Sequence, residues 1–163
     1  MRIGYAVRGL AAGGAATAVM TAALEALYRR LPAGERAPMP PRQITVHAAE
    51  AVGLAKHLDE PARFRASLLL HAAYGTGTGA VVYALLRRAP GPGPLVGVLA
   101  GVVVYLLGYA GWLPLLKLYP PISEEAPARS GQTVLAHMVW GAVLGWCSHS
   151  DLRLSSFRGA TAR

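Results

Sequence analysis

The charged residues of this chain are spaced so that they leave four long apolar windows. Three windows contain no charged residue, with 21 positions after Arg65, 28 after Arg88 and 21 after Arg129. The fourth has 20 positions after Arg8 and is interrupted only by Glu25. A helix needs about 20 apolar residues to cross the hydrocarbon core of a bilayer. The pattern therefore predicts an all-α, four-helix transmembrane bundle in a single domain, residues 1–163, with spans at 9–27, 66–86, 95–116 and 131–150.

The segments between the windows predict how the spans are connected. Every second residue of 89–94 is a proline. Proline lacks a backbone donor and restricts the conformation of the preceding residue, so we expect a tight turn between antiparallel helices. Residues 41–58 predict a short amphipathic helix in the first long loop, because small and apolar side chains share one helical face. That face comprises Ile44, Ala48, Ala51, Ala55 and Leu58. This helix lies either along the membrane surface or in solvent as a loop helix.

Composition and charge agree with a membrane protein. Only 15% of the residues are charged, against about 25% in a soluble domain, and 53% are hydrophobic. The formal net charge of +8 comes from arginines that mostly flank the windows, where they bind anionic lipid headgroups. We therefore expect membrane lipid as a partner and exclude nucleic acid, while a second copy of the chain or another membrane protein stays open. The single cysteine, Cys147, excludes an internal disulfide and a cysteine-based metal cage.

Two segments of the chain repeat one motif. Residues 71–79 and 137–145 both match H-x-x-[YW]-G-x-x-x-G and lie 66 positions apart. The other two spans share a glycine pair four positions apart, at 9–13 and 97–101. We infer a duplicated helical hairpin, with the amphipathic segment as an insertion in the first copy. The two copies run in the same direction, so their approximate twofold axis stands along the membrane normal.

Every predicted span contains such a glycine pair. Small residues let helix backbones approach closely, which provides a contact that lipid itself does not favour. The glycines predicted to pack the helices are Gly9, Gly13, Gly75, Gly79, Gly97, Gly101, Gly141 and Gly145. Residues four apart share a helix face, so His71 lies in line with Gly75 and His137 with Gly141. Both imidazoles are therefore expected to point into the helix contacts, at matching depth.

The two histidines form the candidate site, because ionisable groups inside a membrane usually face a partner or a wet cavity. In one interpretation, neutral imidazoles join helices through hydrogen bonds and the protein has no activity that the sequence reveals. In a second, His71, His137 and Glu25 relay protons or conduct a small solute. In a third, the protein is an electron carrier in which the two histidines are axial ligands of haem b, or the histidines share a metal. Tyr74 and Trp140, one turn from the histidines, are placed to stack on them or to hydrogen-bond to them.

Enzymatic motifs are absent from the sequence. It contains no G-x-S-x-G, P-loop or H-E-x-x-H motif, so we predict no catalytic residue, no metal ligand and, apart from the haem alternative, no cofactor. Other aromatic residues lie near span ends, where they are expected to anchor helices at the membrane interface. These are Tyr109, Trp112, Tyr119 and Trp146.

Several short motifs resemble a bacterial family. The two H-x-x-[YW]-G helices, Pro-Pro-Arg at 40–42 and Tyr-Pro-Pro at 119–121 are similar to those of the YagU-like family of uncharacterised inner-membrane proteins. The resemblance implies a multi-pass protein of the bacterial inner membrane and brings no established activity. Four spans place both termini on one side. Short basic segments flank the helix ends there, and seven of the eight acids lie on the other side, which favours cytoplasmic termini.

Overall fold

The computed structural model describes residues 3–160 and, within them, the side chains of residues 4–151. Over residues 3–160 the chain forms helices and turns and no strand. The helices are α1 (Ile3–Tyr28), α2 (Pro40–Ala51), α3 (Glu60–Leu86), α4 (Gly93–Leu107), α5 (Leu113–Leu115) and α6 (Pro127–Ala160). Short 3-10 turns lie at Ala33–Glu35, Ala55–His57 and Ile122–Glu124, and a π-helical turn lies at Gly108–Trp112. The predicted all-α class is therefore confirmed.

Three segments are long and apolar enough to cross a membrane: Gly4–Tyr28, Glu60–Leu86 and Gly93–Leu115. They cover nearly all of the first three predicted spans. The fourth predicted span lies in α6, which is not among these segments. Its polar residues Gln132, Thr133 and Ser148 are buried, with at most 4% of each exposed. These groups lower the hydropathy of α6 but are buried within the structure.

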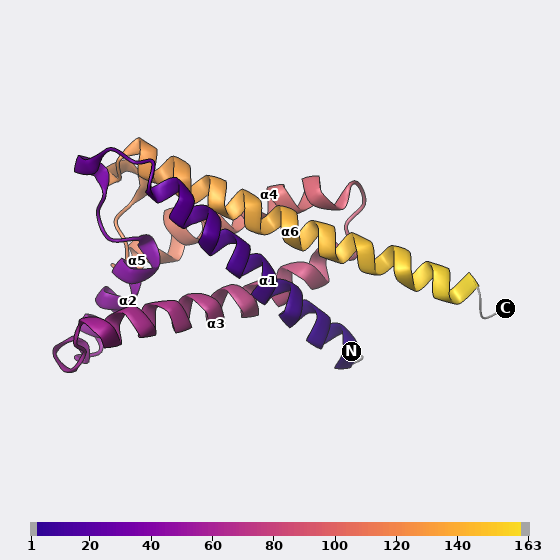
Figure 1. Ribbon diagram of the computed structural model, residues 1–163, viewed down its shortest axis with the longest axis horizontal. Coiled ribbons are helices and arrows are strands. Elements are labelled where there is room, and N and C mark those ends of the chain that lie inside the picture. The colour runs from indigo at the N-terminus through magenta and orange to yellow at the C-terminus, as the bar shows by residue number, and fades with distance from the viewer. Residues whose placement is uncertain (1–2, 161–163) are drawn as a thin grey trace.

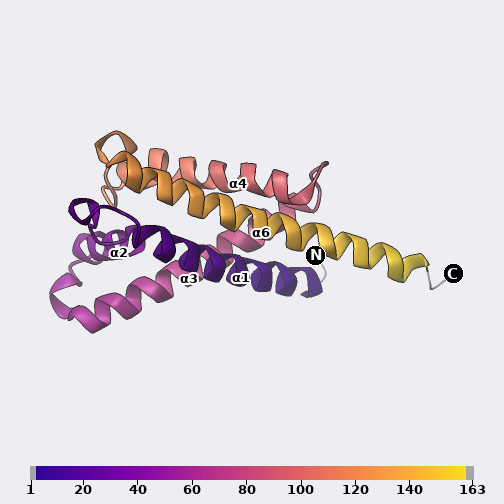
Figure 2. The same cartoon turned by 45° about the horizontal axis from the view of Figure 1, so that its top comes forward.

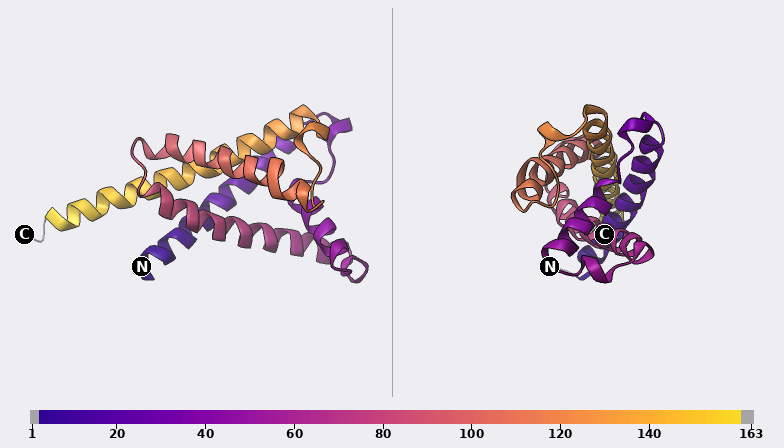
Figure 3. Two further views of the ribbon diagram at one scale, coloured as in Figure 1. Left: turned by 180° about the vertical axis from the view of Figure 1, so that it is seen from behind. Right: turned by 90° about the vertical axis from the view of Figure 1, so that its left-hand side faces the viewer.

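The helices form a bundle with two different ends (Figure 1). The start of α1, the end of α6 and the turn between α3 and α4 lie at one end, which we call the terminal end (Figures 1 and 3). α2 and the two long loops lie at the opposite end, the α2 end. α4 runs alongside α6 (Figure 2), whereas α1 and α3 cross and then diverge toward the α2 end. The bundle is therefore wider at the α2 end.

Glycine lets α1 cross α3 at close range. A Cβ added to Gly13 would lie 2.5 Å from the Thr76 carbonyl oxygen and 3.2 Å from the Gly79 Cα. Gly9 packs one turn further along α3, and Gly75 packs on a threonine side chain of α1. Because a larger residue at these positions would meet backbone or a β-branched side chain, the crossing requires small residues.

The glycines of α4 and α6 interlock in the same manner. A Cβ on Gly97 would collide with the carbonyl oxygen of Gly141, and one on Gly93 with that of Gly145. Gly101 packs in the same way one turn further along. The contact thus uses three glycines of α4, one more than the sequence predicts. Gly93 was not predicted as a packing glycine, because it lies in the proline-rich segment 89–94 that was expected to be a turn, whereas α4 already begins at Gly93.

The two glycine-packed helix pairs differ in register. Gly13 of α1 lies opposite Gly79 of α3. In the repeat, Gly101 is the counterpart of Gly13 and Gly145 is the counterpart of Gly79. Yet Gly101 lies opposite Gly141, one turn before Gly145. The two hairpins therefore share their glycine positions. The register between the two helices of the second hairpin, however, differs by about one helical turn from the register in the first.

The third predicted span, 95–116, is not one straight helix. A π-helical turn follows Leu107, with non-helical backbone angles at Gly111 (φ −115°, ψ −107°), and α5 comes after it. Pro114 supplies the physical reason. A proline lacks the N–H that would bond to the carbonyl four residues earlier, and its ring clashes with that carbonyl, so the preceding turn widens. The wide turn places Tyr109 and Trp112 around the interior of the bundle.

The predicted amphipathic helix over 41–58 is shorter than expected, and its most buried positions are shifted by one residue from the predicted face. α2 ends at Ala51, and Gly53 follows with a φ of +73°, a left-handed conformation that favours glycine and ends a helix. Residues 55–57 form a separate 3-10 turn. Thr45 and Ala49 are buried, whereas Ala51 is exposed, so the buried face is rotated from the predicted one. α2 covers the end of the bundle with this face.

The prediction of interface anchors is wrong for two tyrosines. Tyr109 and Tyr119 are only 7% and 3% exposed, and their rings pack edge to face with centroids 5.1 Å apart. The π-helical turn and the loop after α5 direct both rings inward. Trp146, in contrast, is 64% exposed on α6, as an anchor requires.

Candidate functional site

A cavity of about 310 Å³ lies inside the bundle toward the α2 end. His71 from α3 and His137 from α6 both line it, so the structure brings the two predicted histidines to one space. Its volume is at the lower end of the range of about 300–1,000 Å³ typical of small-molecule sites. Most of the wall is apolar, including Met20, Leu24, Ile44, Val104, Trp112, Leu113 and Trp140.

His137 is held in one orientation. Its Nδ1 lies 2.8 Å from the backbone oxygen of Thr133, one turn earlier in α6. A carbonyl oxygen only accepts, so Nδ1 carries the proton and donates, which leaves a free lone pair on Nε2 of the neutral ring. The rings of Tyr105 and Tyr109 pack against the imidazole with centroid distances of 5.5 and 5.8 Å. His137 thus presents a hydrogen-bond acceptor at the cavity wall.

His71 has a different environment. Its Nε2 is buried and has no hydrogen-bond partner among the described residues. A buried polar atom without a partner costs free energy that a ligand with a suitable group would recover. His71 also lines a second, larger space, so its side chain lies between two neighbouring spaces.

The second space is a groove of about 800 Å³ between α1 and α3, where these helices diverge (Figure 1). Small residues line much of it: Gly14, Thr17, Ala18, Thr21, Ala22, Ala72 and Thr76. Leu24, Pro41 and His71 line both the groove and the cavity, so the two spaces adjoin. Glu25 lines the groove and not the cavity, and its Oε1 lies 3.1 Å from Nε of Arg29.

Tyr74 and Trp140 line the cavity, but they do not make the expected contacts with the histidines. Trp140 donates its Nε1–H to the Thr17 hydroxyl at 3.2 Å. Tyr74 packs beside Trp112 with ring centroids 5.9 Å apart. Both side chains find partners on other segments, on α1 for Trp140 and in the π-helical turn for Tyr74. The aromatic neighbours of His137 come instead from α4 and the π-helical turn.

Both spaces end where the glycines pack. Their lining residues belong to the half of the bundle nearer α2. Toward the terminal end, α1 meets α3 at Gly13 and Gly79, and α4 meets α6 at Gly97 and Gly141. Within the described residues, the site is therefore a chamber that is closed toward the terminal end.

The size and the lining of the cavity bear on the haem alternative. At about 310 Å³ its volume is at the lower end of that for drug-sized ligands, and a porphyrin is a large macrocycle. The Tyr105 and Tyr109 rings already occupy the space beside the His137 imidazole. Over the part of the chain that the structure describes, no group of three or more His, Cys, Asp or Glu residues is placed to hold a metal ion.

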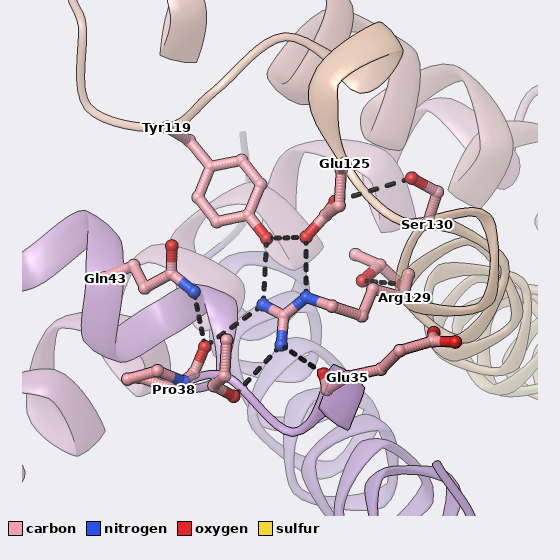
Figure 4. Close-up of polar contacts among 9 residues, drawn as sticks. Glu35, Pro38, Gln43, Tyr119, Glu125, Arg129 and Ser130 are labelled. Carbon is pink, nitrogen blue, oxygen red and sulfur yellow. Dashed lines mark hydrogen bonds and ion pairs between the residues drawn. The ribbon is translucent and has the colours of Figure 1, made fainter. Parts of the chain in front are cut away.

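A buried arginine at the start of α6 was not predicted from the sequence (Figure 4). Arg129 is 6% exposed, and its Nε lies 3.1 Å from Oε1 of Glu125. Its terminal nitrogens donate to the Tyr119 hydroxyl and to the backbone oxygens of Glu35, Ala37 and Pro38, over 3.0 to 3.5 Å. All five N–H groups of the guanidinium therefore have an acceptor. Arg129 ties the loop before α2 to α6 and has no donor left for a ligand.

The hydroxyl of Tyr119 completes this cluster. It donates a hydrogen bond to the Glu125 carboxylate. Burial, together with this hydrogen bond, raises the pKa of Tyr119, so the hydroxyl keeps its proton at neutral pH. Burial acts to lower the pKa of Arg129, but the bonds to Tyr119 and Glu125 outweigh it and the pKa is raised. The cluster is thus a charged pair and a neutral phenol.

A second polar cluster joins helices at the terminal end. Asp151 of α6 accepts a hydrogen bond from the Tyr83 hydroxyl of α3. Its carboxylate also lies 3.7 Å from Arg8 of α1 and 3.9 Å from Arg87. The sequence offered a signal for this cluster, because these charged residues border the apolar windows, but we had assigned the arginines to lipid headgroups.

The chemistry of the site follows from the cavity alone, since the two polar clusters are internally satisfied. Its imidazoles can accept or donate hydrogen bonds, and its apolar wall suits an uncharged molecule. Comparisons with models of protein families, with curated proteins and with solved structures find no match for this chain.

Proposed function

We propose that this chain is a four-helix integral membrane protein that binds a small, mainly apolar molecule in the cavity between His71 and His137. The arrangement of the two imidazoles carries the proposal. Histidines that only joined helices would hydrogen-bond from one helix to another. Here His137 bonds to its own helix, and Nε2 of His71 has no partner in the described part of the chain. Both imidazoles keep hydrogen-bonding capacity for an occupant.

The polar clusters support α6 as the fourth span. Arg129 and Asp151 lie 22 positions apart on this helix. At a rise of about 1.5 Å per residue, they are separated by about 33 Å, close to the roughly 30 Å of a hydrocarbon core. Arg8 and Arg29 enclose the apolar window of α1 at a similar spacing. Each helix would thus have its charged groups at the two membrane surfaces.

We propose that the protein lies in the bacterial inner membrane with cytoplasmic termini. We also propose that its two helical hairpins arose by duplication. The start of α1 and the end of α6 lie at one end of the bundle, which supports an even number of crossings (Figure 1). The resemblance to the YagU-like family supports the inner membrane. The glycine contacts within α1–α3 and within α4–α6 support the duplication.

Tryptophan fluorescence tests ligand binding. Trp112 and Trp140 line the cavity, whereas Trp146 is exposed. In Trp146→Phe protein in lipid nanodiscs, bromobenzene, a contact quencher, is expected to quench the remaining fluorescence in a saturable manner. Ala48→Phe fills the cavity from α2 and is expected to weaken this quenching. Ala51→Phe, at an exposed position of the same helix, is the matched control and is expected to leave the quenching unchanged.

The shape of the quenching curve decides the outcome. Bromobenzene also dissolves in lipid, so part of the quenching rises linearly with its concentration in every variant. If quenching rises only linearly, and is equal in the Trp146→Phe protein and in its Ala48→Phe and Ala51→Phe variants, the cavity binds nothing and the proposal is wrong.

Proton conduction is the second candidate function. Glu25 lines the groove, His71 lines both spaces and His137 lines the cavity, which supports a path for protons from the α2 end to the middle of the bundle. The glycine contacts close the terminal end, so we favour ligand binding. Loss of a proton flux in liposomes on replacing both histidines with glutamine, in a folded variant, would favour the relay. Absence of flux in the unmodified protein would exclude it.

A further inference from the structure

We propose that the ligand of the cavity is a single-chain amphiphile with a hydroxyl head, which reaches the cavity from the bilayer through the groove between α1 and α3. Its hydroxyl donates a hydrogen bond to Nε2 of His137. The inference rests on the proposed function and identifies the chemical class and the route of its ligand.

The hydrogen-bonding groups of the cavity select a hydroxyl. Nε2 of His137 is an acceptor, because Nδ1 donates to Thr133, and no group of the described residues donates to it. Tyr109 also lines the cavity and is 7% exposed, and its phenol is a second group of the wall that can donate a hydrogen bond. A ligand hydroxyl can donate to the imidazole and accept from the phenol at once. An ether or a ketone can only accept, so it would leave the imidazole without a partner.

The charge of the cavity wall restricts the head further. No Asp, Glu, Lys or Arg lines the cavity among the described residues. A carboxylate, phosphate or ammonium placed there would lose its hydration without gaining an opposite charge, which is costly. A head inside the cavity is therefore uncharged, which excludes a carboxylate or a phospholipid headgroup from that position, since the charged lining residues Glu25 and Arg42 belong to the groove.

The groove provides the route and holds the chain of the ligand. At the α2 end the cavity is covered by α2, whose residues Pro41, Ile44 and Ala48 line it. α2 is fastened there, because Nδ1 of His47 hydrogen-bonds to the Leu118 backbone oxygen at 2.9 Å. The groove, in contrast, lies between two diverging helices, adjoins the cavity beside His71 and holds about 800 Å³. Its small side chains leave room for one hydrocarbon chain.

The first test compares an alcohol with its methyl ether. The probes are 2-bromododecan-1-ol and its methyl ether, added to Trp146→Phe protein in nanodiscs, with the tryptophans that line the cavity as reporters. We expect the alcohol to reach half-maximal quenching at a concentration roughly three- to tenfold lower, the effect of one net hydrogen bond. His137→Leu is expected to abolish the difference. His57→Leu, which changes an exposed histidine, is expected to preserve it.

The second test blocks the groove without changing the cavity. Ala72 lines the groove, and its neighbour Ala73 is exposed and lines neither space. Ala72→Phe is expected to slow or weaken quenching by the alcohol, and Ala73→Phe is expected to have no effect.

The outcomes separate this inference from the proposed function. Equal saturable quenching by alcohol and ether would leave a binding cavity but overturn the hydroxyl class. Equal behaviour of the Ala72 and Ala73 variants would overturn the route. If neither probe quenches saturably and bromobenzene fails as well, the proposed function is wrong.

Discussion

At the scale of single residues, Arg129 is expected to contribute most to stability. It is a buried charge whose five donors all have acceptors, including the Glu125 carboxylate. Removing one partner of a buried ion pair costs about 3–5 kcal/mol, because the remaining charge is left unpaired. Arg129→Met is therefore expected to lower the unfolding free energy by about that amount, measured by denaturant titration in detergent. Arg30→Met, at an exposed arginine, is the control and is expected to change it by less than about 0.5 kcal/mol.

The same cluster is expected to make the stability of the fold depend on pH in the alkaline range. The pKa of Tyr119 is raised in the folded state, so folding favours the protonated phenol. Its contribution to stability is complete below the unfolded pKa of about 10 and is lost as the pH rises above that value. We expect the midpoint of thermal unfolding to fall above about pH 10 in the unmodified protein. Tyr119→Phe should fall less steeply over this range, and identical profiles for the two proteins would contradict the assignment.

At the scale of helices, close packing and helix propensity make opposite predictions for two glycines. Gly141 lies against the backbone of Gly97, so the Cβ of Gly141→Ala would push α4 and α6 apart. Gly77 of α3 has no atom within 4 Å of an added Cβ, so Gly77→Ala is expected to stabilise its helix by up to about 1 kcal/mol. Thermal unfolding in nanodiscs should show a lower midpoint for the first variant and an equal or higher midpoint for the second. A gain in both would mean that α4 and α6 pack less closely.

The positions of the apolar helices could be predicted from sequence because lipid excludes charge. Charged residues border the apolar windows but not always the helices: α3 ends at Leu86, the last residue of its window, yet it begins at Glu60, before Arg65. The internal irregularities were harder to predict. Pro114 was visible, but the π-helical turn it causes depends on how the following loop packs. The buried face of α2 was rotated from the predicted one because the neighbours of this helix, and not its own pattern, decide which side is covered.

At the scale of the whole molecule, the two halves of the chain create the site together. His71 and His137 could be predicted as a pair because each is four residues from a packing glycine, a relation that sequence shows. The Arg129 cluster could not be predicted. Its ion pair with Glu125 joins residues only four apart and looks like an ordinary local surface pair. Its other acceptors are mostly backbone oxygens more than 90 positions away in the chain. Only the fold brings that loop to α6.

The number of membrane crossings is the prediction that tests the whole arrangement. If α6 crosses as the fourth span, the turn after α3 and the end of α6 face one side, and the loop before α6 faces the other. Single cysteines at Ala89, Ser123 and Ser155, introduced into Cys147→Ala protein in sealed inverted vesicles, report these positions to a membrane-impermeant maleimide. With cytoplasmic termini, the first and third sites are expected to react at once and the second only after permeabilisation. Labelling of Ser123 and Ser155 variants on the same side would mean that α6 does not cross. Its buried polar residues would then belong to a helix packed on a three-span protein, and the cavity between His71 and His137 would lie at the membrane surface.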